Sequence, residues 1–142
     1  MEASELLIEK IKAFEGFSRD AYRDAAGVLT IGYGHTGRDV REGDRISTYG
    51  AEQLLLLDVG ECEAAVRRLH VAHTQGQFDA LVSFAFNLGV GRLNRSTLIK
   101  VIRKGGSKTA IQREFKRWVY AGGKRLAGLE KRRQWEATRF FE

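Results

Sequence analysis

Apolar residues recur with a helical period near the start of the chain. Four of them are spaced to share one face of a helix: Leu6, Leu7, Ile11 and Phe14. This spacing predicts a helix over residues 4–15, with Ser4 as a suitable N-cap and Gly16 as a suitable stop.

Between residues 17 and 46 the helical period gives way to short alternating runs broken by glycines. This pattern predicts a small antiparallel sheet with tight turns at DAAG (24–27) and REGD (41–44). VLTIGYG (28–34) is predicted to form one strand, whose side chains alternate between two faces. One face is apolar (Leu29, Ile31 and Tyr33) and the other is small (Thr30, Gly32 and Gly34).

The remainder of the chain has a helical pattern. A long helix is predicted from Ser47 to about His70, followed by an almost wholly apolar helix over 77–88. The three polar residues of that second helix fall four apart and form one stripe: Asp79, Ser83 and Asn87. Further helices are predicted over 96–104, 107–120 and 129–141.

These elements predict an α+β fold within one domain of two lobes. A sheet lobe spans about 12–50, a connecting helix about 47–70, and a helical lobe about 71–142 that also includes helix 4–15. With 43% hydrophobic and 30% charged residues, the chain has the balance of an ordinary globular protein.

A formal net charge of +6 favours polyanionic partners, among them nucleic acid, anionic membranes and acidic cell walls. No apolar run approaches the ~20 residues that span a bilayer, so no stable membrane insertion is expected. The N-terminus lacks the apolar stretch of a secretory signal, and we expect synthesis in the cytoplasm and release by another protein. Cys62 is the only cysteine, which excludes an internal disulfide. A monomer is expected.

Two carboxylates carry the candidate chemistry. Glu15 lies at the end of the first predicted helix, where the helix dipole and burial beside Phe14 and Phe17 both favour its neutral form. A general acid needs that form. Asp24 begins a turn and is expected to stay exposed and ionised. Two carboxylates with such contrasting surroundings are typical of glycoside hydrolases. Taken alone, however, Glu15 could be an exposed charge at a helix end and Asp24 a turn-forming residue.

The spacing of these residues is more specific. A Glu, eight residues, an Asp, five residues and a Thr, followed by IGYGH, closely resemble the signature of the phage lysozyme family. GDRIS (43–47), FNLG (86–89), RST (95–97) and GGKRLAGLEKRRQWE (122–136) resemble further family features in the same order. The resemblance implies a two-lobed lysozyme fold that hydrolyses the β-1,4 bond between N-acetylmuramic acid and N-acetylglucosamine in bacterial peptidoglycan. It implies that Glu15 is the proton donor, that Asp24 and Thr30 position the attacking water, and that the configuration inverts.

The resemblance also suggests supporting residues. His35 is either a hydrogen-bonded structural histidine or the partner of Asp58, and if it pairs with Asp58 its pKa should lie well above ~6.5. Arg132 or Arg133 is expected to reach Glu15. The expected substrate-binding residues are Thr36, Phe86, Asn87, Ser96 and Gln112.

The alternative function is a basic helical domain that binds nucleic acid. Such a domain needs clustered Arg and Lys with a recognition helix or an aromatic platform, whereas the basic residues here are dispersed over several helices. His70 and His73 lie near Cys62 in the sequence, but no second ligand pair has zinc spacing. We therefore expect neither a metal nor a cofactor.

Overall fold

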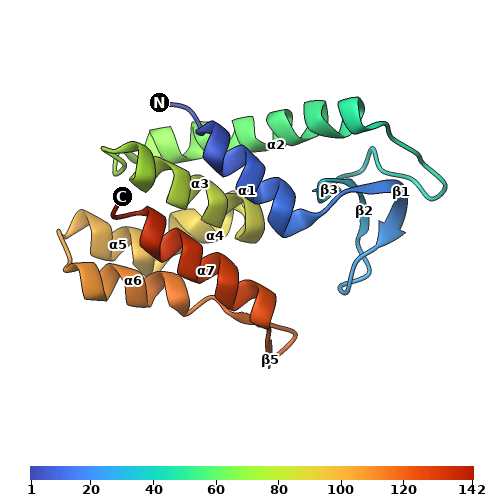
Figure 1. Cartoon of the computed structure of the whole chain (residues 1–142). Coiled ribbons are helices and arrows are strands. Elements are labelled where there is room, and N and C mark those ends of the chain that lie inside the picture. Colours follow the sequence, from blue (N-terminus) through green and yellow to red (C-terminus); the bar gives the residue numbers. More distant parts are fainter. The chain divides into compact units, whose positions relative to one another are not determined.

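A computed structural model describes all residues 1–142 and contains seven helices and five strands (Figure 1). This composition and order confirm the predicted α+β class. The elements are α1 (Glu5–Glu15), β1 (Ser18–Arg23), β2 (Leu29–Gly32), β3 (His35–Thr36), α2 (Thr48–Leu69), α3 (Gln75–Leu88), α4 (Val90–Arg95), α5 (Thr97–Arg103), α6 (Lys108–Lys116), β4 (Tyr120–Ala121), β5 (Lys124–Arg125) and α7 (Ala127–Arg139).

The chain forms two compact units. The sheet unit comprises Ile8–Glu61, and the helical unit comprises Met1–Leu7 with Cys62–Glu142. Helices α1 and α2 each contribute residues to both units. No helix combines the length and the apolarity that are needed to cross a bilayer.

In the sheet unit, β1, β2 and β3 form an antiparallel sheet in that order, with a bulge in β1 between Ser18 and Tyr22. The prediction of a single strand over 28–34 is wrong, because β2 ends at Gly32. Gly32 and Gly34 have φ values of +66° and +75°, a backbone conformation that favours glycine and here turns the chain into β3.

Both predicted turns of the sheet unit are present. Gly27 N donates to Asp24 O at 2.9 Å, and Asp44 N donates to Arg41 O at 3.1 Å. The turns therefore fall where the sequence places them, even though the strand between them is shorter than expected.

Capping side chains begin α1 and α2 as predicted. Ser4 Oγ accepts a hydrogen bond from Leu7 N at 3.1 Å, and Ser47 Oγ accepts one from Gly50 N at 3.0 Å. Each bond satisfies a backbone donor that the helix itself leaves unpaired. Gly16 ends α1 with a φ of +71°.

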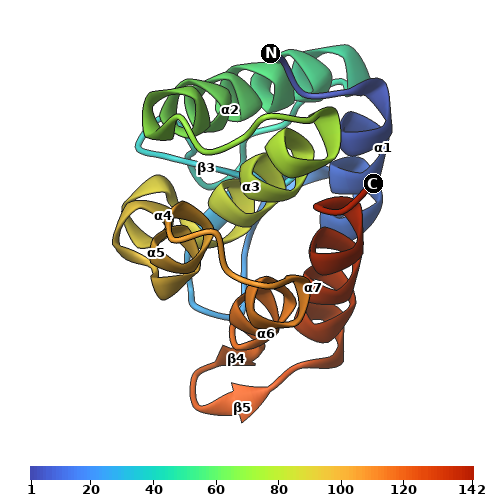
Figure 2. The same cartoon turned by 90° about the vertical axis from the view of Figure 1, so that its left-hand side faces the viewer.

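Helix α3 is the centre of the helical unit, where α7 lies alongside α6 (Figure 2). The Phe84 ring of α3 meets the rings of Phe115 and Trp118 edge-on, at centroid distances of 5.9 and 5.6 Å. Phe115 lies in the last turn of α6 and Trp118 just after that helix, so aromatic packing fixes the end of α6 against α3.

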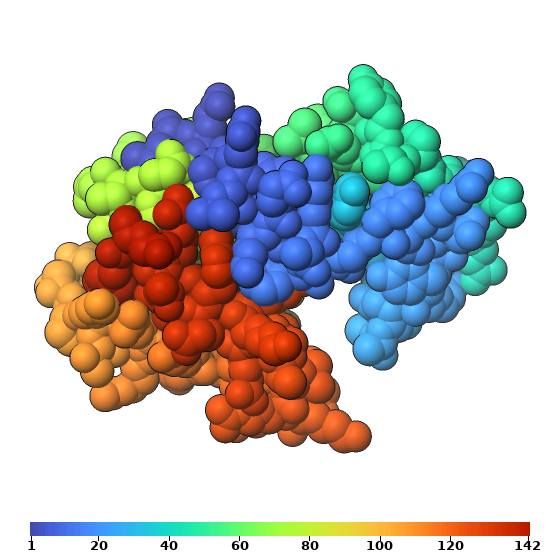
Figure 3. Space-filling model, viewed as in Figure 1, coloured from blue at the N-terminus to red at the C-terminus, as the bar shows by residue number.

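The helical unit departs from the sequence prediction in two places. After Gly89, whose φ is 102°, the chain turns and immediately forms the short helix α4. The helix predicted over 107–120 ends at Lys116, and the chain continues into a β4–β5 hairpin that projects from the unit (Figure 3). Gly122 and Gly123 both have positive φ, which is the requirement of a tight two-residue hairpin turn.

The polar stripe predicted on α3 forms a polar seam with α7, in three contacts. Asp79 pairs with Arg139, Ser83 donates to Glu136, and Asn87 accepts from Arg133. The partners advance along α3 while they recede along α7, so the two helices are antiparallel.

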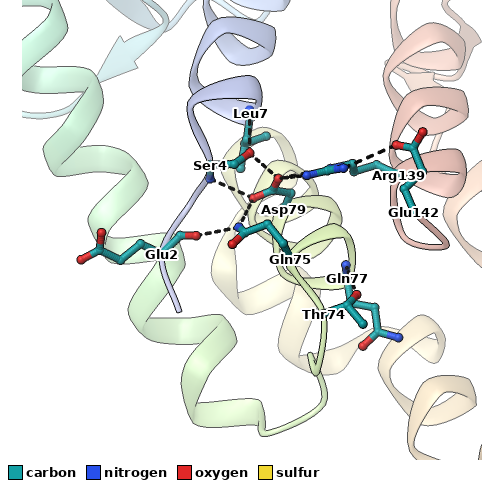
Figure 4. Close-up of polar contacts among 9 residues, drawn as sticks. All are labelled: Glu2, Ser4, Leu7, Thr74, Gln75, Gln77, Asp79, Arg139 and Glu142. Atoms are coloured by element: carbon teal, nitrogen blue, oxygen red, sulfur yellow. Dashed lines mark hydrogen bonds and ion pairs between the residues drawn. The ribbon is translucent and has the colours of Figure 1, made fainter.

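The Asp79 contact of this seam belongs to a polar cluster within the helical unit (Figure 4). Asp79 is fully buried, and its carboxylate accepts hydrogen bonds from Ser4, Gln75 and Arg139. The cluster thus joins the N-cap of α1 to the start of α3 and the end of α7.

Candidate active site

Glu15 is the last residue of α1, and its carboxyl group lies against the turn between β2 and β3. A Cβ atom placed on Gly34 would be 2.8 Å from Glu15 Cδ and closer still to Oε1. Real Cβ atoms essentially never approach another atom so closely, so position 34 must lack a side chain while Glu15 keeps this place. Gly34, the second glycine of the IGYGH motif, therefore leaves space for the side chain of the candidate acid.

Asp24 is held by the turn that it begins. Its Oδ1 atom accepts hydrogen bonds from Ala26 N and Val28 N, both at 2.9 Å. Its own backbone N donates to Val28 O at 3.0 Å. These bonds fix the side chain through Oδ1 and leave Oδ2 as the atom that can act on a substrate or a water.

Thr30 lies beside Asp24, because both residues contact the same carbonyl group. The Thr30 hydroxyl donates to Val28 O at 3.0 Å, and the residue is 4% exposed. Because its hydrogen is already used, the hydroxyl can only accept a hydrogen bond from a further group. Across the sheet, Thr36 of β3 is the direct partner of Thr30 and is exposed.

The sheet unit thus brings together two sets of predicted residues. The turn after β1 joins Asp24 to Thr30 and its neighbour Thr36, and the turn after β2 receives Glu15. The contact of Gly34 with Glu15 was not predicted, because the sequence placed Gly34 only on the small face of the predicted strand.

His35 is paired with two carboxylates. His35 Nδ1 is 2.8 Å from Asp58 Oδ2, as predicted, and Nε2 is 3.1 Å from Asp39 Oδ2. Burial by itself lowers the pKa of His35, but the hydrogen bonds and charges of Asp58 and Asp39 outweigh it and raise that pKa above its usual value. The second partner, Asp39, was not predicted, although it lies four residues along the chain.

The two partners of His35 respond differently to their surroundings. Burial raises the pKa of Asp58 despite the opposing hydrogen bond from His35. The hydrogen bond from His35 lowers the pKa of the exposed Asp39. The His35 ring therefore connects the segment after β3 to α2.

The four predicted substrate-binding residues of the helical unit lie at three helices: α3, α5 and α6. Phe86 and Asn87 are half-buried in the last turn of α3. Ser96 is buried and caps α5, accepting from Ile99 N at 3.3 Å and donating to Leu93 O at 2.7 Å. Gln112 of α6 donates to Ala137 O at 3.1 Å. Their roles in binding stay predictions.

Arg133 is fully buried, and its guanidinium is engaged within the helical unit. Nε is 2.8 Å from Glu136 Oε1, Nη2 donates to Asn87 Oδ1 at 2.9 Å, and Nη1 donates to Trp118 O at 3.3 Å. Burial raises the pKa of Glu136, although Arg133 and a 2.6 Å bond from Ser83 favour its charged form. A hydrogen bond from Arg132 to Glu15 stays a prediction.

No group of three or more His, Cys, Asp and Glu side chains is arranged to hold a metal ion. The single thiol, Cys62, is buried.

Comparison with known proteins gives consistent matches. The profile of the phage lysozyme family matches residues 12–136. The chain is 46% identical to an endolysin of Bacillus phage B103 over 99% of its own length, but it spans only 54% of that relative, or about half. It is 39% identical to an endolysin of Acyrthosiphon pisum secondary endosymbiont phage 1, and that match covers 99% of this chain and 98% of the relative.

The fold is also similar to a solved structure, an endolysin from Escherichia coli O157:H7 phage FAHEc1. The TM-score is 0.87 at 38% sequence identity, and the match covers 100% of this chain and 94% of the other. These matches confirm the resemblance read from the Glu15–His35 motif, and the chain belongs to the phage lysozyme family.

Proposed function

We propose that this chain is a lysozyme that hydrolyses the β-1,4 bond between N-acetylmuramic acid and N-acetylglucosamine in bacterial peptidoglycan. The observation that carries the proposal is the arrangement of the sheet unit. Glu15 is held against Gly34 at one turn, and Asp24 and Thr30 share the Val28 carbonyl at the other. Membership of the phage lysozyme family supports it, and the net charge of +6 suits an acidic cell wall.

In this mechanism Glu15 is the general acid. Its carboxyl group donates a proton to the glycosidic oxygen while the bond from that oxygen to the anomeric carbon breaks. The contact with Gly34 restricts where the carboxyl group can lie, which keeps it in the position from which it donates.

Asp24 and Thr30 position the attacking water. Asp24 Oδ2 and Thr30 Oγ1 can each accept a hydrogen bond, so together they can hold both hydrogens of one water molecule. The lone pair of that water is then directed at the anomeric carbon, on the face opposite the departing oxygen. As the new bond forms, the water's proton passes to Asp24, and the configuration inverts.

The helical unit supplies the substrate contacts in this proposal, and Thr36 supplies one from the sheet unit. The proposed contact residues are Thr36, Phe86, Asn87, Ser96 and Gln112. The protein acts as a monomer at the bacterial cell wall, without a metal or a cofactor.

Replacing Glu15 tests the proposal. Glu15→Gln keeps the size of the side chain and removes its transferable proton, so clearing of permeabilised bacterial cells should slow by at least about 10²-fold. Glu9→Gln is the matched control, because Glu9 lies on the same helix and its side chain is 72% exposed. Equal clearing by Glu15→Gln and Glu9→Gln would refute the assignment. A covalent glycosyl adduct trapped on Asp24 would refute the water-positioning role.

A further inference from the structure

The side-chain amide of Asn87 has a fixed orientation. A guanidinium group only donates hydrogen bonds, so the amide atom that lies 2.9 Å from Arg133 Nη2 must be the acceptor, Oδ1. The amino group, Nδ2, therefore points away from Arg133. No backbone or side-chain oxygen accepts a hydrogen bond from Nδ2.

The surrounding contacts prevent the amide from turning over. Arg133 is held by Glu136 at 2.8 and 3.1 Å, by the Trp118 carbonyl, and by the Phe84 ring, whose centroid is 5.4 Å from Cζ. Ser83 in turn holds Glu136. A reversed amide would set its amino group against a buried guanidinium, and two facing donors would both lose their bonds.

Asn87 itself remains half-exposed at the end of α3, whereas Arg133, Glu136 and Ser83 are buried. The polar seam therefore ends in a neutral donor of fixed direction that solvent can reach. A donor of fixed direction is most selective for a partner that can only accept a hydrogen bond. An amide carbonyl is such a partner, whereas a sugar hydroxyl can rotate to donate or accept.

We propose that Asn87 donates a hydrogen bond from Nδ2 to an amide carbonyl oxygen of the substrate, and that Arg133 is the positioning residue that fixes this direction. The inference rests on the proposed function, since peptidoglycan supplies the carbonyl. Two parts of the wall carry such groups, namely the acetamido groups of the sugars and the stem peptides.

Asn87→Asp separates donation from the structural role. The carboxylate has the same shape and still accepts from Arg133, but an acceptor replaces the donor. KM on cell walls should rise about tenfold, the value of one neutral hydrogen bond, with little change in kcat. If the partner is an acetamido group, binding of the N-acetylglucosamine tetramer should weaken by the same factor. Asn94→Asp, on the exposed surface of α4, makes the same charge change and should leave both values unaltered.

Two substrates distinguish the sources of the carbonyl. If the acetamido group is the partner, the Asn87→Asp effect persists on glycan strands stripped of stem peptides and disappears on de-N-acetylated strands. If the stem peptide is the partner, the effect disappears on stripped strands and the tetramer binds both variants equally. In either case the wild-type protein must clear cell walls, so failure of the proposed function is seen separately.

Equal KM values for Asn87→Asp and Asn94→Asp on intact walls would overturn the inference. If Asn87→Asp does not fold, the wild-type protein still provides the test through the NMR signals of its Asn87 amino protons. These signals should shift when the tetramer or soluble peptidoglycan fragments are added. Signals that stay unmoved by both ligands would equally overturn it.

Discussion

Gly34→Ala separates the position of the candidate acid from the stability of the fold. The new Cβ atom would lie 2.8 Å from Glu15 Cδ, whereas ordinary van der Waals contact begins at 3.4 Å. Glu15 Oε1 would lie closer still, so the carboxyl group must move by at least about 0.6 Å. A displacement approaching 1 Å can slow a reaction about 10²-fold because the reacting atoms lose alignment. The φ of +75° adds about 1–2 kcal/mol of backbone strain, which lowers the free energy of unfolding.

Gly43→Ala is the matched control for this prediction. Gly43 belongs to the same unit and has a φ of +84°, but a Cβ atom added there would have no neighbouring atom within 4 Å. Both variants should lose similar stability in urea titrations, while only Gly34→Ala should lose the clearing of permeabilised cells. If the two variants keep the same activity, the contact between Gly34 and Glu15 does not position the acid.

Two further predictions concern the charged groups of the two units. Because the pKa of His35 is raised in the folded protein, its stabilisation is fully present below the unfolded value of about 6.5 and is lost as pH rises through the raised value. Urea titrations over a pH series should show this loss, and Asp58→Asn should flatten it more than Asp39→Asn, since the Asp39 side chain is 65% exposed and that of Asp58 only 27%; equal slopes in all three proteins would contradict the pairing. Ser83→Ala should lower the free energy of unfolding by about 1.5–3 kcal/mol, because it removes a buried 2.6 Å hydrogen bond to charged Glu136. A loss below about 0.5 kcal/mol would mean that Arg133 alone satisfies the carboxylate.

Local signals in the sequence predict much of this fold. Ser4, Ser47 and Gly16 mark helix boundaries because capping and left-handed stops depend on neighbouring residues. The β4–β5 hairpin was missed because its strands are only two residues long, and the alternation of so short a strand cannot be distinguished from a helix end. The limit of β2 was misjudged because side-chain alternation does not report the φ of Gly32.

Some residues of the candidate site could likewise be predicted from local sequence, whereas others depend on contacts between distant segments. Glu15, Asp24 and Thr30 lie within one short stretch, so their spacing is visible in the sequence. The partners of the α3 stripe are not, because Arg133 and Glu136 lie about 50 residues further along the chain. A polar stripe on an apolar helix indicates that partners exist, but only the packing of α7 identifies them.

The polar seam between α3 and α7 also restricts which amino-acid substitutions the two helices can accept during evolution. Removing one member of a buried charge pair, such as Asp79 or Arg139, leaves the other uncompensated, whereas replacing both with well-packed apolar residues is often neutral or stabilising. Substitutions in this interface are therefore expected to be tolerated as matched pairs. A library that varies α3 alone would discard solutions that a joint library of α3 and α7 would retain.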